Sequence, residues 1–325
     1  MTTRKRLSRV LHIVLATGVG CAAQAPVAPS PNAVWTSAPS MLHARAAHAV
    51  AATDDAIFAL AGSGSDNGAP VLEIERFDGV AWRDVARLPG QGLNAPAAVT
   101  LSGKVYLVGG FRTITNAPTS DVHVFDPNSN EWSKAPDLPA ARGGHAAAIL
   151  DGRIHIVGGG NSRSTLADHS VLDIATNTWV ARAPLPRALG SPAAVVHNGT
   201  LYVIGGRSGP RDFGDVMIYD EKADSWSNGP SIEPRATCGA ASIHGSIYVF
   251  GGESQAQARV LADVLRLRGH ATAWETASPM PTARNFARAV IFRDALYVIG
   301  GSTVPQTSHA PIGTAVVERM QLKPR

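Results

Sequence analysis

The chain has 325 residues, of which 45% are hydrophobic and 17% charged, and these values exclude an intrinsically disordered chain and a coiled coil. The formal charge of +4 comes from the first nine residues, which hold four of the 29 basic residues and leave 25 to face the 25 acidic ones. A nearly neutral body excludes bulk binding to nucleic acid, which requires a concentrated positive charge.

The N-terminus is typical of an export signal. Residues 1–9 are basic, and a mostly apolar run follows that is too short to span a bilayer. The run ends at Cys21 in a sequence that resembles a bacterial lipoprotein cleavage site, although Gly18 stands where a leucine is usual. Ordinary cleavage after Ala25 is the alternative. We therefore expect an exported protein, either a lipoprotein anchored through Cys21 in the outer membrane or a periplasmic or secreted protein.

A period of about 48 residues runs through the rest of the chain. Tryptophans recur every 47 to 50 residues, and pairs of glycines follow the same period, each after a short apolar strand. The tryptophans are Trp35, Trp82, Trp132, Trp179, Trp226 and Trp274, and the pairs begin at Gly109, Gly158, Gly205, Gly251 and Gly300, with Ala61-Gly62 as a degenerate sixth. Such a period predicts a repeat architecture rather than separate domains.

Each unit contains four short strands separated by turn residues, and four-stranded units arranged radially form a β-propeller. The glycine pair, the tyrosine that often precedes it and the tryptophan near the end of each unit resemble the Kelch repeat of the galactose oxidase-like superfamily. The resemblance implies an all-β, six-bladed Kelch-type propeller with four antiparallel strands per blade. We expect residues 1–21 to be the export signal, residues 22–32 a Pro/Ala tether and residues 33–322 the propeller.

The ends of the repeat region predict how the ring closes. The last unit has three strands near 286–292, 295–300 and 314–322 but no trailing tryptophan, and Trp35 precedes the first complete unit. Residues 33–37 are therefore expected to supply the outer strand of the sixth blade.

One face of the propeller carries the candidate binding residues. The position sixteen residues before each glycine pair holds Arg45, Arg142, Arg235 and Arg284 in four units and leucine in the other two, and His48 and His145 follow three residues later. These arginines resemble the ones with which acidic-peptide-binding Kelch domains bind carboxylates. We expect these six residues, with Arg112 and Arg207 from the loops after the glycine pairs, to bind an acidic peptide, protein loop or glycan. The alternative is that the arginines cap the starts of strands or pair with neighbouring Asp residues and that the histidines are packed or hydrogen-bonded near the channel.

An enzymatic alternative rests on the loop after the fifth glycine pair. Glu253, Arg259 and Asp263 resemble a segment of bacterial sialic acid mutarotases. The resemblance implies that Glu253 moves the anomeric proton and that Arg259 binds the sugar carboxylate. A solvated loop residue or a salt-bridge partner is the other interpretation of Glu253, and a purely structural envelope protein is a third function.

Other chemistry is not expected. Four of the five tyrosines lie in the strand before a glycine pair and Tyr219 lies in a later strand, so none is available for a copper-radical site like that of galactose oxidase. No nucleotide, zinc or hydrolase motif is present. We expect a monomer with no metal or other cofactor and no membrane contact except through a lipid anchor.

Overall fold

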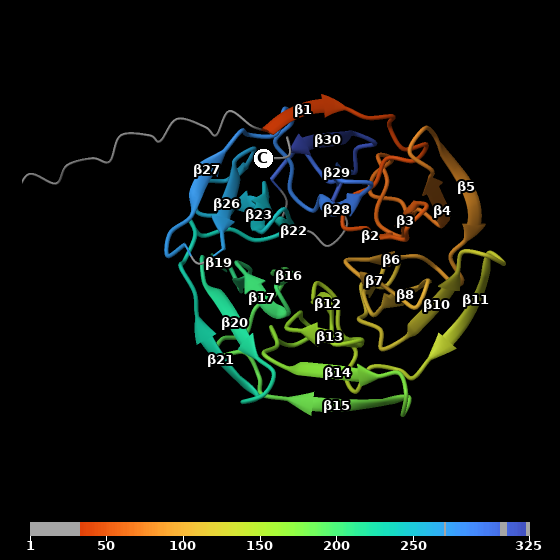
Figure 1. Cartoon of the computed structure of the whole chain (residues 1–325). Helices are drawn as coiled ribbons and strands as arrows, with labels where there is room; N and C mark the ends of the chain where they lie inside the picture. Colours follow the sequence, from red (N-terminus) through yellow and green to blue (C-terminus); the bar gives the residue numbers. More distant parts are fainter. Residues whose placement is uncertain (1–32, 270, 306–310, 323–325) are drawn as a thin grey trace, which may run out of the picture.

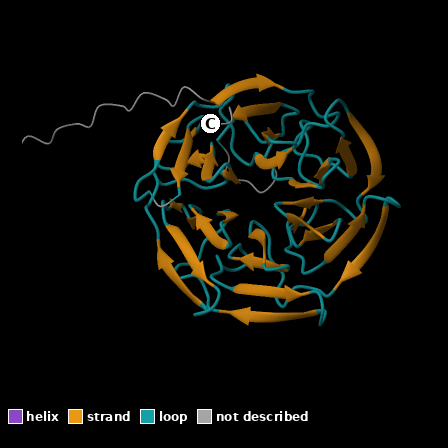
Figure 2. Cartoon of the chain, viewed as in Figure 1, coloured by secondary structure: helices purple, strands orange, loops and turns teal. Residues whose placement is uncertain are grey.

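The computed structural model describes residues 33–269, 271–305 and 311–322, and within these ranges it consists of strands and loops without a helix (Figure 2). The expected export signal, Cys21 and the tether lie outside the described residues. The strands form six four-stranded antiparallel sheets around a central axis (Figure 1). The all-β, six-bladed propeller expected from the sequence is confirmed.

Each blade runs from an inner strand at the axis to an outer strand at the rim, in chain order except in the last blade. The first three blades are β2 (Ala49–Ala52), β3 (Ile57–Leu60), β4 (Glu73–Phe77) and β5 (Trp82–Arg87); β7 (Ala97–Leu101), β8 (Lys104–Val108), β10 (Val122–Asp126) and β11 (Glu131–Ala135); and β12 (Ala146–Leu150), β13 (Arg153–Val157), β14 (His169–Asp173) and β15 (Thr178–Arg182). The next two are β16 (Ala193–His197), β17 (Thr200–Ile204), β20 (Val216–Asp220) and β21 (Ser225–Asn228); and β22 (Gly239–Ile243), β23 (Ser246–Phe250), β26 (Val264–Arg268) and β27 (Glu275–Ala277).

The sixth blade joins the two ends of the chain. It contains β28 (Arg288–Phe292), β29 (Ala295–Ile299), β30 (Val317–Leu322) and, as its outer strand, β1 (Ala33–Ser37). Strand β1 pairs antiparallel with β30, with Trp35 opposite Met320, and Figure 1 shows the two differently coloured ends of the chain side by side. The predicted closure by residues 33–37 is therefore confirmed, and β1 covers the outward edge of β30 that would otherwise be unpaired.

The tryptophans connect each blade to the one before it. Every Trp Nε1 donates a hydrogen bond of 2.6–3.0 Å to a backbone carbonyl of the preceding blade or the segment that leaves it. The series crosses the closure, because Trp35 of β1 donates to Ser278 O and Trp82 donates to Pro39 O. The rings also pack on apolar side chains, so each tryptophan combines apolar burial with one directed contact between blades.

The glycine pairs bring neighbouring blades into backbone contact. The second residue of each pair donates its N–H to a carbonyl of the next blade at 2.8–2.9 Å, as Gly110 does to Arg142 O. A side chain on the first residue would collide with the same carbonyl: at Gly109, with φ of +56°, a Cβ atom would lie 2.6 Å from Arg142 O and 2.9 Å from the His145 ring. Glycine is needed here both for its backbone conformation and for the close approach.

Candidate functional site

The loops that enter the inner strands and the loops that follow the glycine pairs share one end of the propeller, which we call the loop face. Three two-stranded sheets join loop strands there: β6 (Leu93–Asn94) with β9 (Phe111–Arg112), β18 (Arg207–Ser208) with β19 (Arg211–Asp212), and β24 (Glu253–Ser254) with β25 (Arg259–Val260). Isolated bridges such as Ala236 to Glu253 join the two kinds of loop in other blades. The candidate residues are therefore gathered at one face, and their side chains decide which of them can meet a ligand.

The four arginines expected to surround the channel mouth are buried instead. Arg45 is 0% exposed, and Arg142, Arg235 and Arg284 are each 1% exposed. Each donates from Nη1 to the carbonyl oxygen of the first residue of its own glycine-pair position, over 2.9–3.2 Å. The predicted ring of ligand-binding arginines is wrong for this structure, because these side chains close the ends of their own blades and no guanidinium faces the solvent.

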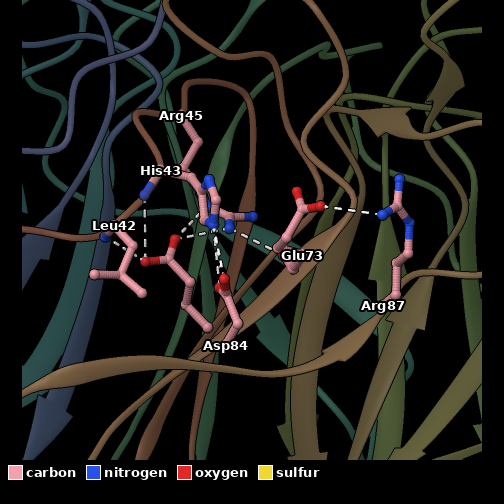
Figure 3. Close-up of polar contacts among 7 residues, drawn as sticks. Leu42, His43, Arg45, Glu73, Asp84 and Arg87 are labelled. Carbon is pink, nitrogen blue, oxygen red and sulfur yellow. Dashed lines mark hydrogen bonds and ion pairs between the residues drawn. The ribbon is translucent and has the colours of Figure 1, made fainter.

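Acidic side chains within the blades complete the arginine sites. Glu75 Oε2 lies 2.7 Å from Arg45 Nη2, and Figure 3 shows the guanidinium enclosed by polar groups from its own blade. Glu318 Oε2 lies 2.7 Å from Arg284, Asp263 Oδ2 lies 2.6 Å from Arg235, and Asp168 Oδ2 lies 4.0 Å from Arg142. Burial lowers the pKa of Arg45, while the charge of Glu75 opposes that change.

The two blades without these arginines have leucine at the same position. Leu93 and Leu189 are 6% and 0% exposed, so the position is a core position that accepts either an apolar side chain or a fully paired arginine. In these blades the acidic residue before the third strand is paired from elsewhere. Asp121 accepts from Arg112 Nη2 at 3.0 Å, and Asp215 accepts from Arg187 Nε at 3.1 Å. Arg112, expected to bind a ligand, is thus held against its own blade, although its side chain remains 43% exposed.

The two histidines lie between blades. A Cβ atom on Gly109 would lie 2.9 Å from His145 Cε1, and one on Gly300 would lie 2.7 Å from His48 Cε1, so each ring packs on the glycine pair of the preceding blade. Burial lowers the pKa of His145 to about 3 and lowers that of His48 as well. The expectation that they bind the loop-face ligand is wrong, because both are neutral packing residues beneath that face.

A polar network on the loop face links three consecutive blades. Arg207 donates from Nε to Asp212 Oδ1 at 3.1 Å, and its Nη2 lies 2.8 Å from Glu253 Oε1. Asn285 of the sixth blade donates from Nδ2 to Glu253 Oε2. Asp212 also accepts the N–H of Gln255 at 2.6 Å. Glu253 is 1% exposed. It is therefore a buried salt-bridge partner of Arg207 and not a solvated loop residue.

Glu253 and Arg259 are not brought together. In the hairpin of β24 and β25, Glu253 pairs with Val260 and Ser254 pairs with Arg259. Successive residues of a strand point to opposite sides, so Glu253 and Arg259 face opposite ways. Arg259 and Ser254 line a pocket beside Trp274 that Glu253 does not line. Arg259 Nε donates a hydrogen bond to the side chain of Gln257. The geometry does not assemble the Glu–Arg pair that the mutarotase resemblance implies.

A pocket of about 540 Å³ on the loop face is the best candidate binding site. Phe111 and Phe286 form an apolar floor with Ala46, Ala47 and Ala95. The polar part of the lining includes Asn161, Arg163, Ser191, Arg207 and Gln255. Arg163 and Arg207 are the charged residues of this lining, and no Asp or Glu belongs to it among the described residues.

The sequence identified only part of this pocket. Arg207 was expected from its place in a loop after a glycine pair, but no sequence pattern distinguished Arg163 or Phe111 from their neighbours in the corresponding loops. Phe286 was missed. Its signal is a break in the repeat: the five other blades have Ala47, Ala95, Gly144, Ser191 and Thr237 at this position. A large apolar side chain among small ones at the channel mouth predicts a plug or a contact surface.

The described residues contain neither a cluster of metal ligands nor a membrane-spanning helix. No group of three or more His, Cys, Asp or Glu side chains there could hold a metal ion. Within the same ranges, no helix is long and apolar enough to cross a membrane.

Comparison with known proteins agrees with this architecture. Residues 95–301, more than half of the chain, match the family model described as the KLHDC2/KLHL20/DRC7 Kelch-repeats domain. Kelch-like protein terF of Aspergillus terreus is 28% identical over 48% of this chain and 37% of its own length. Kelch-like protein 23 of Mus musculus is 26% identical over 77% of this chain and 36% of its own length. The chain thus spans little more than a third of the length of these relatives.

A solved structure titled "Structure of YjhT" matches 86% of this chain and 95% of its own, with a TM-score of 0.72 and 17% sequence identity. At that identity the likeness concerns the fold. The matched family model, the six registered repeats and the glycine-pair and tryptophan contacts lead to one conclusion: the chain belongs to the Kelch-repeat family.

Proposed function

We propose that this protein is an interaction module that binds a carboxylate-bearing ligand, such as an acidic peptide, a loop of a partner protein or an acidic glycan, in the loop-face pocket. One observation carries the proposal: the charged side chains of the lining are two arginines, and the described lining contains no carboxylate. Arginine binds carboxylates through two parallel hydrogen bonds and keeps its charge at any physiological pH. The proposal keeps the expected class of ligand and the expected Arg207, and it replaces the buried arginines with Arg163.

The two arginines have different parts in this scheme. Arg207 is held in place by Asp212 and Glu253, whose charges offset its own, so it contributes a fixed edge of the pocket. Arg163 is exposed and forms no ion pair with any residue that the structure describes. Asn161 Oδ1 accepts the N–H groups of Arg163 and Ser164 at 2.8 and 2.9 Å, which fixes the turn that carries Arg163. The attraction for an anion comes from Arg163, and the floor of Phe111 and Phe286 receives the apolar part of the ligand.

The test compares an acidic probe with its neutral counterpart. We would measure binding of an acetylated, amidated tetraglutamate and of the tetraglutamine analogue to the wild type, Arg163→Ala and Arg83→Ala. Arg83 is the matched control, because it is an exposed arginine on outer strand β5, away from the pocket. We expect Arg163→Ala to weaken tetraglutamate binding about tenfold or more, since a charged hydrogen bond contributes about 1.5–3 kcal/mol. Equal affinity for the two probes, or an equal loss in both variants, would refute the proposal.

A further inference from the structure

The central channel contains a second cavity, of about 120 Å³, below the loop face. Its walls are the inner strands of all six blades, and most of the lining residues are alanine or glycine. The first residue of the inner strand is Ala49, Ala97, Ala146, Ala193 and Gly239 in the first five blades. In the sixth blade this residue is Arg288. One long cation therefore occupies a position that is otherwise kept small.

The charge of Arg288 is not balanced by an acidic side chain. Its Nε donates to His48 O at 2.8 Å, and it forms no ion pair across the described ranges. Its positive charge contributes to lowering the pKa of His48 and His145, which belong to the first and third blades, and it acts on the thiol of Cys238 in the fifth. Arg288 lines the cavity that the inner strands of all six blades enclose, and its charge affects residues of three other blades. It therefore lies near the axis of the channel.

This cavity shares no lining residue with the loop-face pocket, and a ring of backbone hydrogen bonds lies between the two. Six residues with positive φ, one per blade, form a backbone belt in which each N–H after the first donates to the carbonyl of the preceding blade at 2.6–3.0 Å. They are Ala47, Ala95, Gly144, Ser191, Thr237 and Phe286. The Phe286 side chain contacts Ala47, Ala95 and Phe111 above the belt.

We propose that the channel cavity binds one small monovalent anion, a halide or a formate-sized oxyanion, at the guanidinium of Arg288. Arg288 is partly buried, a cation withdrawn from water is costly unless a counter-charge accompanies it, and the cavity provides the space for one. A volume of about 120 Å³ exceeds the roughly 30 Å³ that one water occupies in the liquid. His145 lines the same cavity and is 3% exposed.

Thermal unfolding in bromide tests this site independently of the loop-face proposal. Sodium gluconate, whose anion is much bulkier than bromide, is replaced stepwise by sodium bromide at constant ionic strength. The melting temperature of the wild type should rise by about 2 °C along a saturating curve, because a ligand that binds only the folded state stabilises it. Arg288→Ala, which copies the residue of four other blades, should lose this shift. Arg83→Ala, an exposed control, should keep it.

Anomalous diffraction from bromide-soaked wild-type crystals gives a second measurement that does not depend on a variant. We expect a bromide peak within hydrogen-bond distance of Arg288. An unchanged bromide shift in Arg288→Ala, or only water beside Arg288 in the soaked crystals, would overturn the proposal.

Discussion

At the residue scale, the same position in six repeats takes two chemical forms. In the sixth blade Arg284 pairs with Glu318, whereas in the fourth the equivalent residues are Leu189 and Met217, which pack in one apolar cluster. An arginine sixteen residues before a glycine pair looks the same in sequence whether it faces solvent or the interior. The deciding residue, Glu318, comes 34 residues later and reaches it only through the folded blade. The sequence thus located the position but could not assign its exposure.

The apolar blade suggests a direct test of the buried ion pair. Arg284→Leu should lower the free energy of unfolding by about 3–5 kcal/mol, because it leaves Glu318 buried without its cation. The double variant Arg284→Leu/Glu318→Met copies the fourth blade and should recover more than half of that loss. Urea unfolding at neutral pH measures both. A double variant no more stable than the single one would show that the pair is not an interchangeable unit.

The buried histidines predict a loss of stability on mild acidification. The pKa of His145 is lowered to about 3 by burial, whereas in the unfolded chain it is about 6.5. Both states are neutral above pH 6.5, and below it only the unfolded state gains the proton. Stability therefore falls as the pH decreases from about 6.5 towards 3, by at most about 1.4 kcal/mol per pH unit for each such histidine.

His145→Cys introduces the residue that the fifth blade has at this position, Cys238, and removes one such group. The free energy of unfolding is measured in urea at several pH values between 6 and 4.5. It should depend less steeply on pH in the variant, because the variant takes up about one proton fewer when it unfolds. Parallel pH curves for the wild type and the variant would contradict this assignment.

At the element scale, ring closure depends on one short strand. Strand β1 pairs along its whole length with β30, and Trp35 packs edge-on against Phe250 of the fifth blade, with ring centroids 6.2 Å apart. It therefore joins the first residues of the propeller to its last two blades. Because a missing outer strand exposes the edge of β30 and removes the Trp35 contact, the whole ring should respond, not the sixth blade alone.

Deletion of residues 33–40 should lower the melting temperature by roughly 10 °C. Trp35 is partly buried against the fifth blade; loss of a fully buried tryptophan costs about 3–5 kcal/mol, and each kcal/mol corresponds to about 2–4 °C in a chain of 150–250 residues. Deletion of residues 24–31, an equal length within the expected tether, is the control. A melting temperature that does not change when 33–40 are removed would refute closure by β1.

At the scale of the whole molecule, the loop face combines residues that are far apart in the sequence. Arg207, Glu253 and Asn285 come from three blades and meet in one network. This network and the opposite orientation of Arg259 argue against proton transfer by Glu253 to a bound sugar. A general base needs to reach the proton it removes, and both carboxylate oxygens of Glu253 are engaged within the protein.

We therefore expect no acceleration of the α/β anomer exchange of N-acetylneuraminic acid, which exchange NMR can follow with and without the protein. The Glu253→Gln and Arg259→Ala variants should give the same rate as buffer. Acceleration by the wild type that Glu253→Gln abolishes would restore the mutarotase interpretation and show that the network opens when the sugar binds.

By itself, the sequence determined the repeat, the number of blades and the closure by residues 33–37. These depend on local patterns, namely apolar strands, turn residues and a regular tryptophan, which recur independently in each unit. Only the tertiary structure decided which charged side chains are available. The burial of Arg45 depends on Glu75 of its own blade, the packing of Phe286 on Ala95 and Phe111 of another blade, and the position of Arg288 on the small residues of five other inner strands. Such contacts join residues that are distant in the chain, so burial and pairing were settled by folding and not by sequence spacing.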